Sequence, residues 1–523
     1  MATPMGRQLS MSQSSLKTVV HFAVSIRILL SVMQIILNTL IPDHEADAFH
    51  QDTIQNPTTG DRVVELALGG FRKWDGAYFL HIAENGYTKS HMFAFFPLLP
   101  FVVRATADSL LAPLQLMMHR RSVLLVAGYL INFAAFVLAV CALYRLTVKV
   151  LQDERLAYSA SVLFCVNPAS VFMCAVYTEA TFSFLSLCGM LFVMSRRFFL
   201  SAVFFGLAAA ARSNGLVSLG FVAYLSAQEV VRTTSATCMR VFNMRTLKRL
   251  CATFSTCVTR VVYSGVIIAA PFLLFQLITH SKICGTNEFS LMQAGKFLSA
   301  VFRHNSTGGR AQQSSQDPCD EELVPSWCCD SFAIPYSKIQ SSHWNVGFMR
   351  YYEFRQIPNF LLASPIITLS LVGAFQYCRA NWEHVRCLGL LQPIRNDYKK
   401  TDMPTASSVG FFSPECFVYI VHLMALLLFG LTTMHIQVIT RFLVSSSPAV
   451  LWYAAHVMQS SLTEGDAPGS PPIKQHGPAQ EGMLPMDIVW RRPVGWKGRL
   501  VRGYFLSYCI IGIALHCNFL PWT

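Results

Sequence analysis

Apolar runs long enough to cross a membrane recur along most of this chain, and they constrain its fold more than any other feature. A helix needs roughly 20 apolar residues to span the hydrocarbon core of a bilayer. Suitable runs occupy residues 17–41, 122–147, 157–176, 180–196, 199–228, 261–280, 358–378, 413–434, 437–457 and 502–521. They predict about 9 to 11 membrane helices, with 199–228 able to form two short ones. The sequence therefore predicts an all-α polytopic membrane protein, with residues 1–523 forming a single membrane domain.

The composition agrees with this prediction. Hydrophobic residues make up 53% of the 523 residues and charged residues only 13%, which is too little charge to cover a soluble protein of this length. Lysine and arginine outnumber aspartate and glutamate by 41 to 28, but the excess falls mainly in short loops between apolar runs. This distribution indicates membrane topology and argues against a nucleic-acid-binding protein, which would need one soluble basic face.

The basic loops orient the chain, because Lys and Arg concentrate on the cytoplasmic side of membrane proteins. They occupy residues 228–260, 379–400 and the turn 195–197. We expect the N-terminus on the same side, with the run 19–40 serving as an uncleaved signal-anchor. Counting spans outward places a first loop, 42–120, and a second large loop, 281–357, on the opposite side of the membrane.

Other segments outside the spans carry their own expectations. Asn305 begins an N-glycosylation sequon within the second loop, which agrees with the topology. The 16 cysteines lie mostly in apolar runs, but those of the second loop can form disulfides if that loop is in an oxidising compartment. Residues 458–498 are rich in proline, glycine and polar residues, which predicts a flexible cytoplasmic linker. The cysteines of the second loop are Cys284, Cys319, Cys328 and Cys329.

The stretch KWDGAYFLHIAENGY, residues 73–87, places one acid at the start of a short amphipathic segment. Asp75 suits an N-cap, Trp74 can pack against Phe79 as a hydrophobic staple, and Gly86 can end the helix. Asparagine or serine would cap equally well, so capping alone does not require a carboxylate. The alternative is that Asp75 presents its carboxylate at the membrane surface for chemistry.

The first loop also contains an apolar segment and further acids at the membrane edge. The segment FAFFPLLP, residues 93–100, is too short to span and too apolar for a surface loop, which predicts an interfacial position. Asp43, Glu45 and Asp47 follow directly after the first apolar run. They form either a solvated turn or the acidic part of a site.

The triplet Asp43-His44-Glu45 raises a metal hypothesis, which the sequence supports weakly. Neighbouring residues point in different directions, and no second histidine stands nearby at ligand spacing. We therefore assign no residue as a metal ligand and name no cofactor, and the sequence does not decide whether a divalent ion assists. The chain has no Walker loop, GxGxxG or HExxH motif, which argues against a nucleotide-driven pump and a zinc protease.

More polar residues stand at the ends of the predicted spans. Ordinary helix-end polarity explains any one of them, although an arginine at membrane depth, such as Arg212, is usually functional or paired. Gathered on one face, such acids and cations would bind a lipid-borne phosphate and an acceptor hydroxyl. The substrate-binding candidates are Trp74, Glu45, Glu179, Arg212, Trp344, Arg350, His435, Gln437 and Arg441.

The chain resembles the family of membrane mannosyltransferases that add the second mannose in glycosylphosphatidylinositol (GPI) anchor assembly, which are glycosyltransferases of the GT-C type. The resemblance runs in family order over nearly the whole chain, and only the regions 305–330 and 458–498 look like insertions. It rests on PDHEADAF, KWDGAYFLHIAENGY, FAFFPLLP, NPASVFMCAVYTEATFSF, AAARSNGLV, PYSKIQSSHWNVGFMRYYEFRQIPNFLLASP and HIQVITRFLVSSSPAVLWY.

The resemblance implies a GT-C-like fold and an inverting enzyme of the endoplasmic reticulum (ER) membrane whose active site faces the lumen. Such an enzyme would transfer mannose from dolichol-phosphate-mannose, in α1,6 linkage, to the first mannose of a GPI precursor. A carboxylate would deprotonate the acceptor hydroxyl, and cationic groups would stabilise the leaving phosphate. The resemblance favours Asp75 as this base, with Asp43 and Asp47 as rivals.

The same resemblance suggests roles for the remaining candidates. Arg212, Arg441 and His435 are candidates for the dolichol phosphate, and the block 344–353 is a candidate for shaping the acceptor groove. An accessory ER membrane subunit is a further expected partner. Two other classes stay open at this point: a polytopic lipid transporter or scramblase, and a non-catalytic ER assembly subunit.

Overall fold

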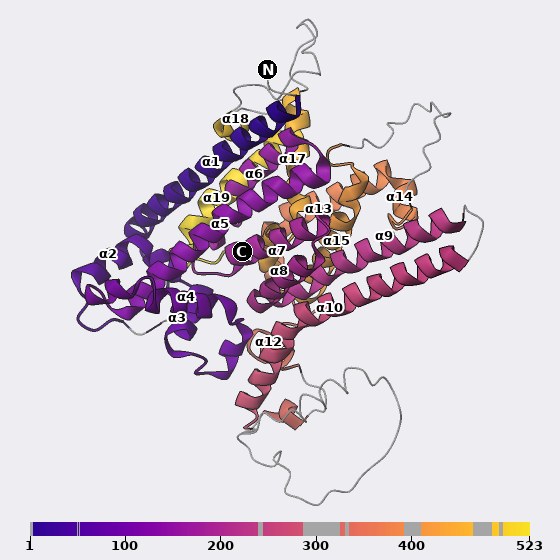
Figure 1. Ribbon diagram of the computed structural model, residues 1–523. Coiled ribbons are helices and arrows are strands. Elements are labelled where there is room, and N and C mark those ends of the chain that lie inside the picture. The colour runs from indigo at the N-terminus through magenta and orange to yellow at the C-terminus, as the bar shows by residue number, and fades with distance from the viewer. Residues whose placement is uncertain are drawn as a thin grey trace, which may run out of the picture.

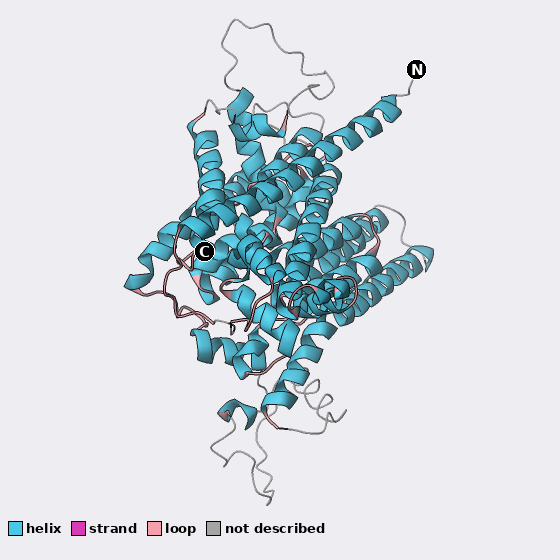
Figure 2. Ribbon diagram, turned by 90° about the vertical axis from the view of Figure 1, so that its left-hand side faces the viewer, coloured by secondary structure: helices cyan, strands magenta, loops and turns pink. Residues whose placement is uncertain are grey.

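The computed structural model describes residues 4–49, 51, 53–238, 244–285, 325–329, 334–391, 409–463, 484–490 and 495–522. These residues form helices and loops, with no strand among them (Figure 2). The α-helices are α1 (Pro4–Leu40), α2 (Thr59–Leu68), α3 (Asp75–Asn85), α4 (Leu98–Asp108), α5 (Arg120–Leu151), α6 (Glu154–Cys165), α7 (Glu179–Met194), α8 (Phe198–Ala211), α9 (Leu219–Cys238), α10 (Met244–Ile283), α12 (Pro335–Trp344), α13 (Ile357–Ala380), α14 (Trp382–Arg386), α15 (Phe417–Thr433), α16 (Ile439–Ser446), α17 (Pro448–Thr463), α18 (Pro485–Trp490) and α19 (Trp496–His516).

Six helical segments in the described part of the chain are long and apolar enough to cross a membrane. Shorter apolar helices occupy Glu179–Met194, Phe198–Ala211 and Ile436–Ser446. The predicted all-α membrane architecture is therefore confirmed. The six segments are Gln13–Leu40, Arg120–Leu151, Met244–Ile283, Phe354–Ala380, Pro414–Thr433 and Trp496–His516.

The apolar run 157–176 does not form one span, and here the sequence prediction is wrong. Helix α6 ends at Cys165, where Asn167 donates from Nδ2 to the carbonyl of Phe164. Pro168 follows and has no N–H with which to continue the helix. Hydropathy detects burial but not this change of backbone conformation, and so the run looked like a single helix.

The chain that follows α6 is a buried irregular loop, residues 166–178, which contains only the short 3₁₀ helix η4 (Ser170–Met173). Buried carbonyl groups outside a helix need other donors. Arg27 of α1 supplies two of them, donating to the carbonyls of Cys165 at 2.5 Å and Ser170 at 3.1 Å. Asn132 of α5 donates to the carbonyls of Ala175 and Tyr177 at 2.5 and 2.8 Å. These two side chains fix the loop against α1 and α5.

Two other apolar runs are also interrupted. The run 199–228 forms α8 and α9, the two-helix alternative, separated by the 3₁₀ helix η5 (Ser213–Ser218). Gly215 in this break approaches α8 closely, since a Cβ there would lie 2.4 Å from the backbone nitrogen of Ala209. The run 437–457 breaks at the extended residue Ser447, after which Pro448 begins α17.

The first and second loops meet at one end of the helical bundle. Helices α2, α3 and α4 lie at this end beside α5, and α12 lies beside the last part of α10 (Figure 1). Phe93 and Phe96 of the apolar segment 93–100 pack in one cluster with Phe275 of α10 and Ile339 of α12. Residues far apart in the sequence therefore form one continuous cap on this end.

Two predicted features fall partly or wholly outside the described residues. Asn305, the predicted glycosylation site, lies outside them. The predicted linker 458–498 is mostly helical where it is described, because α17 continues to Thr463, α18 covers Pro485–Trp490 and α19 starts at Trp496. Ile488 and Val489 of α18 are buried, so this part of the segment belongs to the packed bundle.

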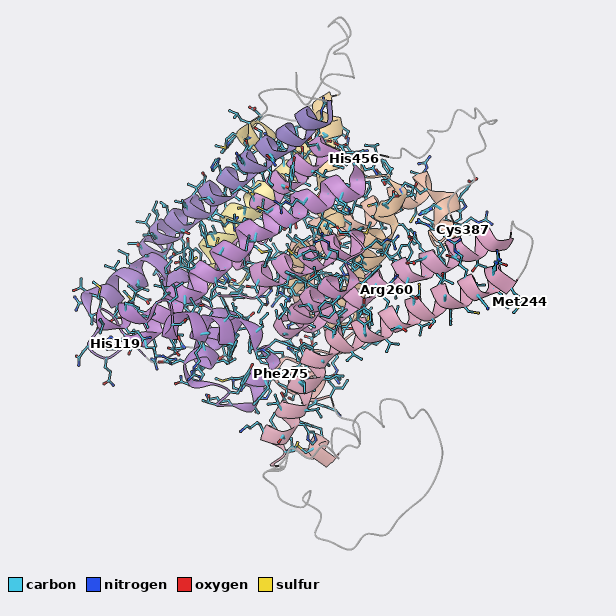
Figure 3. The ribbon with its side chains drawn as sticks, in the orientation of Figure 1. His119, Met244, Arg260, Phe275, Cys387 and His456 are labelled. Atoms are coloured by element: carbon cyan, nitrogen blue, oxygen red, sulfur yellow. A yellow bond between two sulfur atoms is a disulfide. The ribbon has the colours of Figure 1, made fainter. Side chains whose placement is uncertain are left out.

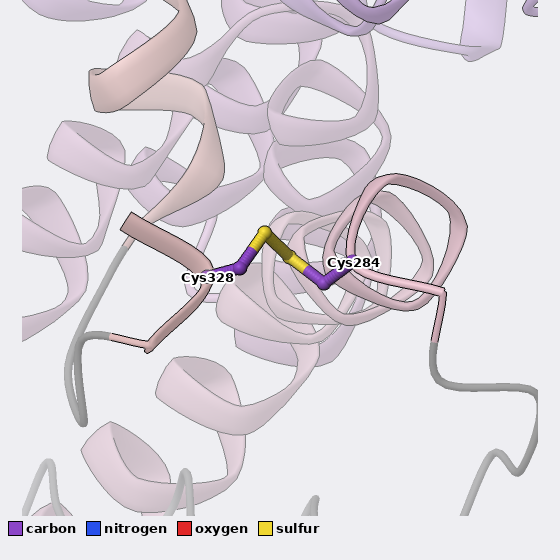
Figure 4. Close-up of a disulfide and its surroundings, with 2 residues drawn as sticks. All are labelled: Cys284 and Cys328. Carbon is purple, nitrogen blue, oxygen red and sulfur yellow. A yellow bond between two sulfur atoms is a disulfide. The ribbon is translucent and has the colours of Figure 1, made fainter. Parts of the chain in front are cut away.

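A disulfide joins Cys284, just after α10, to Cys328 in the 3₁₀ helix η7 (Ser326–Cys329) (Figure 4). Both cysteines belong to the second loop, for which the sequence predicted disulfides in an oxidising compartment. The bond ties the end of a spanning helix to the segment that precedes α12.

We expect proteolytic peptides containing Cys284 and Cys328 to be linked when the protein is digested without reductant, and to separate after reduction. Cys328→Ser should release the linkage, whereas Cys251→Ser, which removes an exposed free cysteine, should leave it intact. Peptide mass spectrometry of the purified protein checks this. Unlinked peptides in the unreduced wild-type protein would contradict the pairing.

Asp61 connects α2 to the start of α5. Its carboxylate is buried and accepts hydrogen bonds from the N–H of Thr58 at 2.8 Å, the N–H of His119 at 2.9 Å and the hydroxyl of Ser122 at 2.6 Å. Burial alone would raise the pKa of Asp61, but the bonds from Ser122, His119 and Thr58 hold it well below its usual value. The charged carboxylate therefore stabilises the packing of α2 against the start of α5.

Asp61→Asn should lower the free energy of unfolding by about 2–3 kcal/mol, since it weakens several bonds to a charged acceptor. Asp108→Asn, which removes a partly exposed ion pair with Arg120, should change it by less than about 1 kcal/mol. Because the pKa of Asp61 is depressed on folding, its contribution is present above about pH 4 and is lost as the pH falls further. Thermal unfolding in detergent at several pH values measures both effects, and equal losses for the two variants would refute the assignment.

Candidate functional site

Asp75 is the first residue of α3 and not its N-cap, so the capping alternative considered from the sequence is wrong. The cap position belongs to Trp74, which makes no side-chain capping bond and has a φ of 58°, a strained value for a bulky residue. The carboxylate of Asp75 turns to Arg441 instead. Gly86 ends the helix as predicted, with a φ of 76° that favours glycine. The backbone is thus strained at Trp74, directly before an acid whose side chain binds Arg441 and not the N–H groups of its own helix.

Four charged side chains from distant parts of the sequence form one alternating network. Arg441 of α16 donates from Nη1 and Nη2 to Asp75 Oδ2 at 3.1 and 3.2 Å. Its Nη1 also lies 3.6 Å from Oε1 of Glu179, the first residue of α7. Arg212, which follows α8, donates to the same Glu179 oxygen at 2.5 Å. Two acids and two arginines therefore balance one another.

The exposure of the side chains increases across the network from Glu179 to Asp75. Glu179 is only 2% exposed and Arg441 16%, whereas Asp75 is 36% exposed. Among the described residues, Oδ1 of Asp75 has no hydrogen-bond partner. Glu179 thus holds two arginines below the surface, while Asp75 keeps one oxygen available at the surface. The sequence prediction gave Glu179 a substrate-binding role and did not foresee this bridging one.

Aromatic residues of the buried loop 166–178 surround the network. The N–H of Asp75 donates to the hydroxyl of Tyr177 at 3.0 Å, which fixes the start of α3 to the loop. The guanidinium carbon of Arg441 lies 4.8 Å from the ring centre of Phe172 and 5.5 Å from that of Tyr177. These ring faces favour a cation, so the loop positions Arg441 as well as Asp75.

The rival acid Asp43 is engaged elsewhere. It forms an ion pair with the buried ammonium of Lys73, which also donates to the side chain of Asn38 and the carbonyl of Cys517. Beside this pair is a cavity of about 410 Å³. Its lining includes Asn38, Asp43, His44, Glu45, Phe49, Lys73, Ala77 and Phe519. Glu45 and Asp43 therefore share one polar hollow that reaches Ala77 of α3.

The third acid, Asp47, lies near α3. Phe49, two residues later, stacks on Tyr78 with ring centres 4.6 Å apart, and Tyr78 stacks on Phe95 at the same separation. Burial, together with the negative charges of Asp75 and Asp47, raises the pKa of Tyr78. Asp47 and Asp75 thus both lie close enough to Tyr78 for their charges to act on its hydroxyl.

The remaining candidates form a second cluster between the second loop and the start of α16. His435 Nε2 lies 2.7 Å from the carbonyl oxygen of Trp344, and its ring stacks on Tyr351 at 4.7 Å. Tyr351 also donates to the side-chain oxygen of Gln437 at 3.1 Å. Arg350 donates to Ser341 at 2.6 Å. This cluster fixes the second loop to the element that carries Arg441.

The two clusters adjoin through Phe95, whose ring centre lies 6.1 Å from Trp344 and 4.6 Å from Tyr78. Trp74, just before α3, packs against Phe519, with the two ring centres 5.7 Å apart. The structure therefore brings most of the predicted site residues to one end of the bundle. Among the described residues, no three His, Cys, Asp or Glu side chains are grouped so as to hold a metal ion.

Sequence reasoning missed several residues that organise this site. Lys73 and Tyr177 stand beside predicted residues in the quoted motifs, yet their partners lie 30 and 102 positions away along the chain. Tyr351 falls within the block 344–353, but nothing in the sequence pointed to its bond with Gln437. The sequence did show polar side chains next to candidate site residues. It did not show the distant residues that these side chains bind.

The comparisons with known protein sequences identify mannosyltransferases among the similar sequences. The family model described as Mannosyltransferase (PIG-V) matches residues 16–523. The chain is 38% identical to the GPI alpha-1,6-mannosyltransferase 2 of Cricetulus griseus and 36% identical to that of Homo sapiens, in each case over 97% of this chain and 99% of the relative. The GPI mannosyltransferase 2 of Drosophila melanogaster is 29% identical over the same shares.

One solved structure is also similar: the archaeal oligosaccharyltransferase AglB from Archaeoglobus fulgidus, in complex with an inhibitory peptide and a dolichol-phosphate. The similarity has a TM-score of 0.45 at 9% sequence identity. It covers 96% of this chain and 56% of the archaeal chain.

Glu179→Gln should destabilise the protein by about 3 kcal/mol, because it leaves two largely buried arginines without the counter-charge that they share. Glu353→Gln is the matched control. It removes an ion pair with Arg355 whose side chains are 42% and 82% exposed, and it should change stability by less than about 1 kcal/mol. Thermal unfolding in detergent distinguishes them, and a Glu179→Gln protein as stable as the control would rule out the bridging role.

Proposed function

This chain belongs to the mannosyltransferase (PIG-V) family, and on that premise we propose that it is a GPI mannosyltransferase that adds the second mannose of the GPI anchor. The donor is dolichol-phosphate-mannose, the acceptor is the first mannose of a GPI precursor, and the new linkage is α1,6. The enzyme resides in the ER membrane with its N-terminus in the cytoplasm and its active site at the luminal end, where α2–α4 and α12 lie. The near-complete matches to relatives carrying this name support the proposal.

The observation that carries the mechanism is the geometry of Asp75. Arg441 holds one carboxylate oxygen, and the other is unbonded among the described residues and partly exposed. An acceptor hydroxyl at hydrogen-bond distance from Oδ1 would meet a base that cannot rotate away. Asp43 is a weaker candidate because Lys73 already pairs with it, and Asp47 has no comparable partner among the described residues.

The reaction is a single in-line displacement. The acceptor oxygen forms a bond to the anomeric carbon while the bond from that carbon to the phosphate oxygen breaks. The acceptor proton passes to Asp75, and the electron pair of the broken bond leaves with dolichol phosphate. A β-linked donor then gives an α-linked product. Phosphate is a good leaving group, so the chemistry of the step does not itself require a nucleotide or a tightly bound metal.

Positive groups near Asp75 fit the charge that develops on the leaving phosphate. We assign this role to Arg212 and Arg441. His435, in the adjoining cluster, is a further candidate for contact with the dolichol phosphate. Arg212 makes its ion pair through Nη1 alone, and among the described residues its Nη2 has no hydrogen bond. Trp344, Arg350 and Gln437 belong to the adjoining cluster, where the acceptor would enter. Glu45 lines the polar hollow beside Asp43, and Trp74 contacts Phe519, which also lines it.

The proposal includes an accessory ER membrane subunit, which co-purification with the tagged chain from solubilised membranes would identify. A lipid transporter or a non-catalytic assembly subunit is less favoured, since the family is one of mannosyltransferases.

Asp75→Asn should reduce mannosyl transfer by about 10²–10⁴-fold, because it removes a base while keeping the side-chain volume. In cells lacking the native enzyme, this variant should fail to restore surface GPI-anchored proteins, and a GPI intermediate with a single mannose should accumulate. Asp43→Asn and Asp47→Asn test the rivals in the same cells, and Asp108→Asn is a control remote from the proposed base. Protein levels in the membrane fraction must match.

Each outcome of this experiment is distinct. Loss of activity in Asp43→Asn or Asp47→Asn with Asp75→Asn active would move the base to the rival acid. Full restoration by all three variants would refute the catalytic function. Accumulation of a different GPI intermediate would reassign the step while leaving the enzyme class intact.

A further inference from the structure

A second cavity lies far from the site described above, where the turn between α7 and α8 meets α9 and α10. It has a volume of about 430 Å³ and is lined by Arg196, Phe198, Glu229, Arg232, Thr233 and Arg260. Three arginines and one glutamate give its lining a net charge of about +2 when all four are ionised. None of these residues takes part in the Asp75 network or in the proposed transfer reaction.

The three arginines come from separate elements and converge on this cavity. Arg260 of α10 pairs with Glu229 of α9 at 2.7 Å and lies over the ring of Phe198, 3.9 Å from its centre. Arg196 approaches the same glutamate at 3.9 Å from the turn before α8. A single carboxylate thus serves two of the guanidinium groups.

The cavity lies where the apolar parts of three neighbouring helices end. The apolar run of α9 ends near residue 228, the apolar run of α10 begins at 261, and α7 ends at Met194. The arginines therefore occupy the boundary between the apolar and polar parts of three neighbouring helices, the depth at which lipid phosphates lie. Figure 3 labels Arg260 part way along α10, between Met244 near one end and Phe275 towards the other.

The tendency of Lys and Arg to lie on the cytoplasmic side does not account for the way these three arginines are arranged. That tendency requires only that the charges lie on one side of the membrane, in any conformation. Here Arg260 is held by an aromatic face and an ion pair and is only 13% exposed, while Arg196 has a left-handed φ of 58°. Arg232 is exposed and completes the group. Side chains arranged in this way around a hollow suit a compact anion rather than bulk solvent.

We propose that this cavity binds a phosphate group, carried by the head group of an anionic membrane lipid or present as free phosphate. Arg196 and Arg232 supply the guanidinium groups that contact it, and Arg260, oriented by Phe198 and Glu229, forms the wall behind it. The site lies apart from the proposed donor and acceptor sites and would stabilise the packing of the α9–α10 hairpin against α8.

The test uses the full chain purified in detergent, with phosphatidic acid, phosphatidylcholine or inorganic phosphate as the probe. Lipid retention in native mass spectrometry and the shift in the thermal unfolding temperature are the readouts. The variant is Arg196→Gln with Arg232→Gln, which keeps the packed Arg260. Its matched control is Arg197→Gln with Lys248→Gln, which removes the same charge from exposed positions outside the cavity lining.

Phosphatidic acid should bind the wild type and the control equally, and the half-saturating concentration should rise about tenfold or more for the cavity variant. Phosphatidic acid bound at the Asp75 site would be unaffected by this variant, so the difference reports the second cavity alone. A response to phosphatidic acid without one to inorganic phosphate assigns the site to a lipid head group. An equal, variant-sensitive response to inorganic phosphate assigns it to the free ion. Binding by the cavity variant indistinguishable from that of the control overturns the proposal.

Discussion

The charge of Arg441, a largely buried arginine, is the constraint on which the rest of the site depends. Removing a guanidinium from water without a counter-charge costs several kcal/mol, so its position requires acids within ion-pairing distance. Asp75 and Glu179 meet that requirement from α3 and α7, and Arg212 balances the second acid. The network therefore links segments separated by as many as 366 positions. It fixes the first loop to the bundle at the point where the carboxylate reaches the surface.

That network depends in turn on a buried irregular loop, whose backbone groups need partners outside the loop. Residues 166–178 carry Phe172 and Tyr177 and lead into Glu179, but their carbonyl groups lie buried without helical partners. Arg27 and Asn132 satisfy four of these carbonyl groups, counting that of Cys165 at the end of α6. An arginine in the first spanning helix thus acts on the site at a distance, through the backbone it holds. Its location in an apolar run, which is costly in lipid, has a structural reason.

The sequence predicted the helical membrane architecture and most of the polar residues at this end, because hydropathy and helix-end chemistry are local signals. It predicted correctly that Gly86 ends α3 and that 199–228 can divide into two helices. It failed where a distant partner decides the outcome. Asp75 looked like a cap because the competing Arg441 was not visible from nearby residues. The run 157–176 looked like one span because hydropathy does not reveal that Arg27 and Asn132 can support a broken helix.

The three acids of the first loop differ in their surroundings more than in their chemistry, and this difference bears on which of them can act as the proposed base. Asp43 is paired with an ammonium that also bonds to an amide and a carbonyl oxygen, so its removal from Lys73 would leave a buried cation poorly compensated. Asp75 is paired with an arginine that Glu179 also neutralises in part. A change of charge at Asp75 therefore leaves Arg441 with a remaining partner. A carboxylate that must accept a proton and then lose it again is best placed where its counter-ion is shared, and of these two paired acids only Asp75 has such a counter-ion.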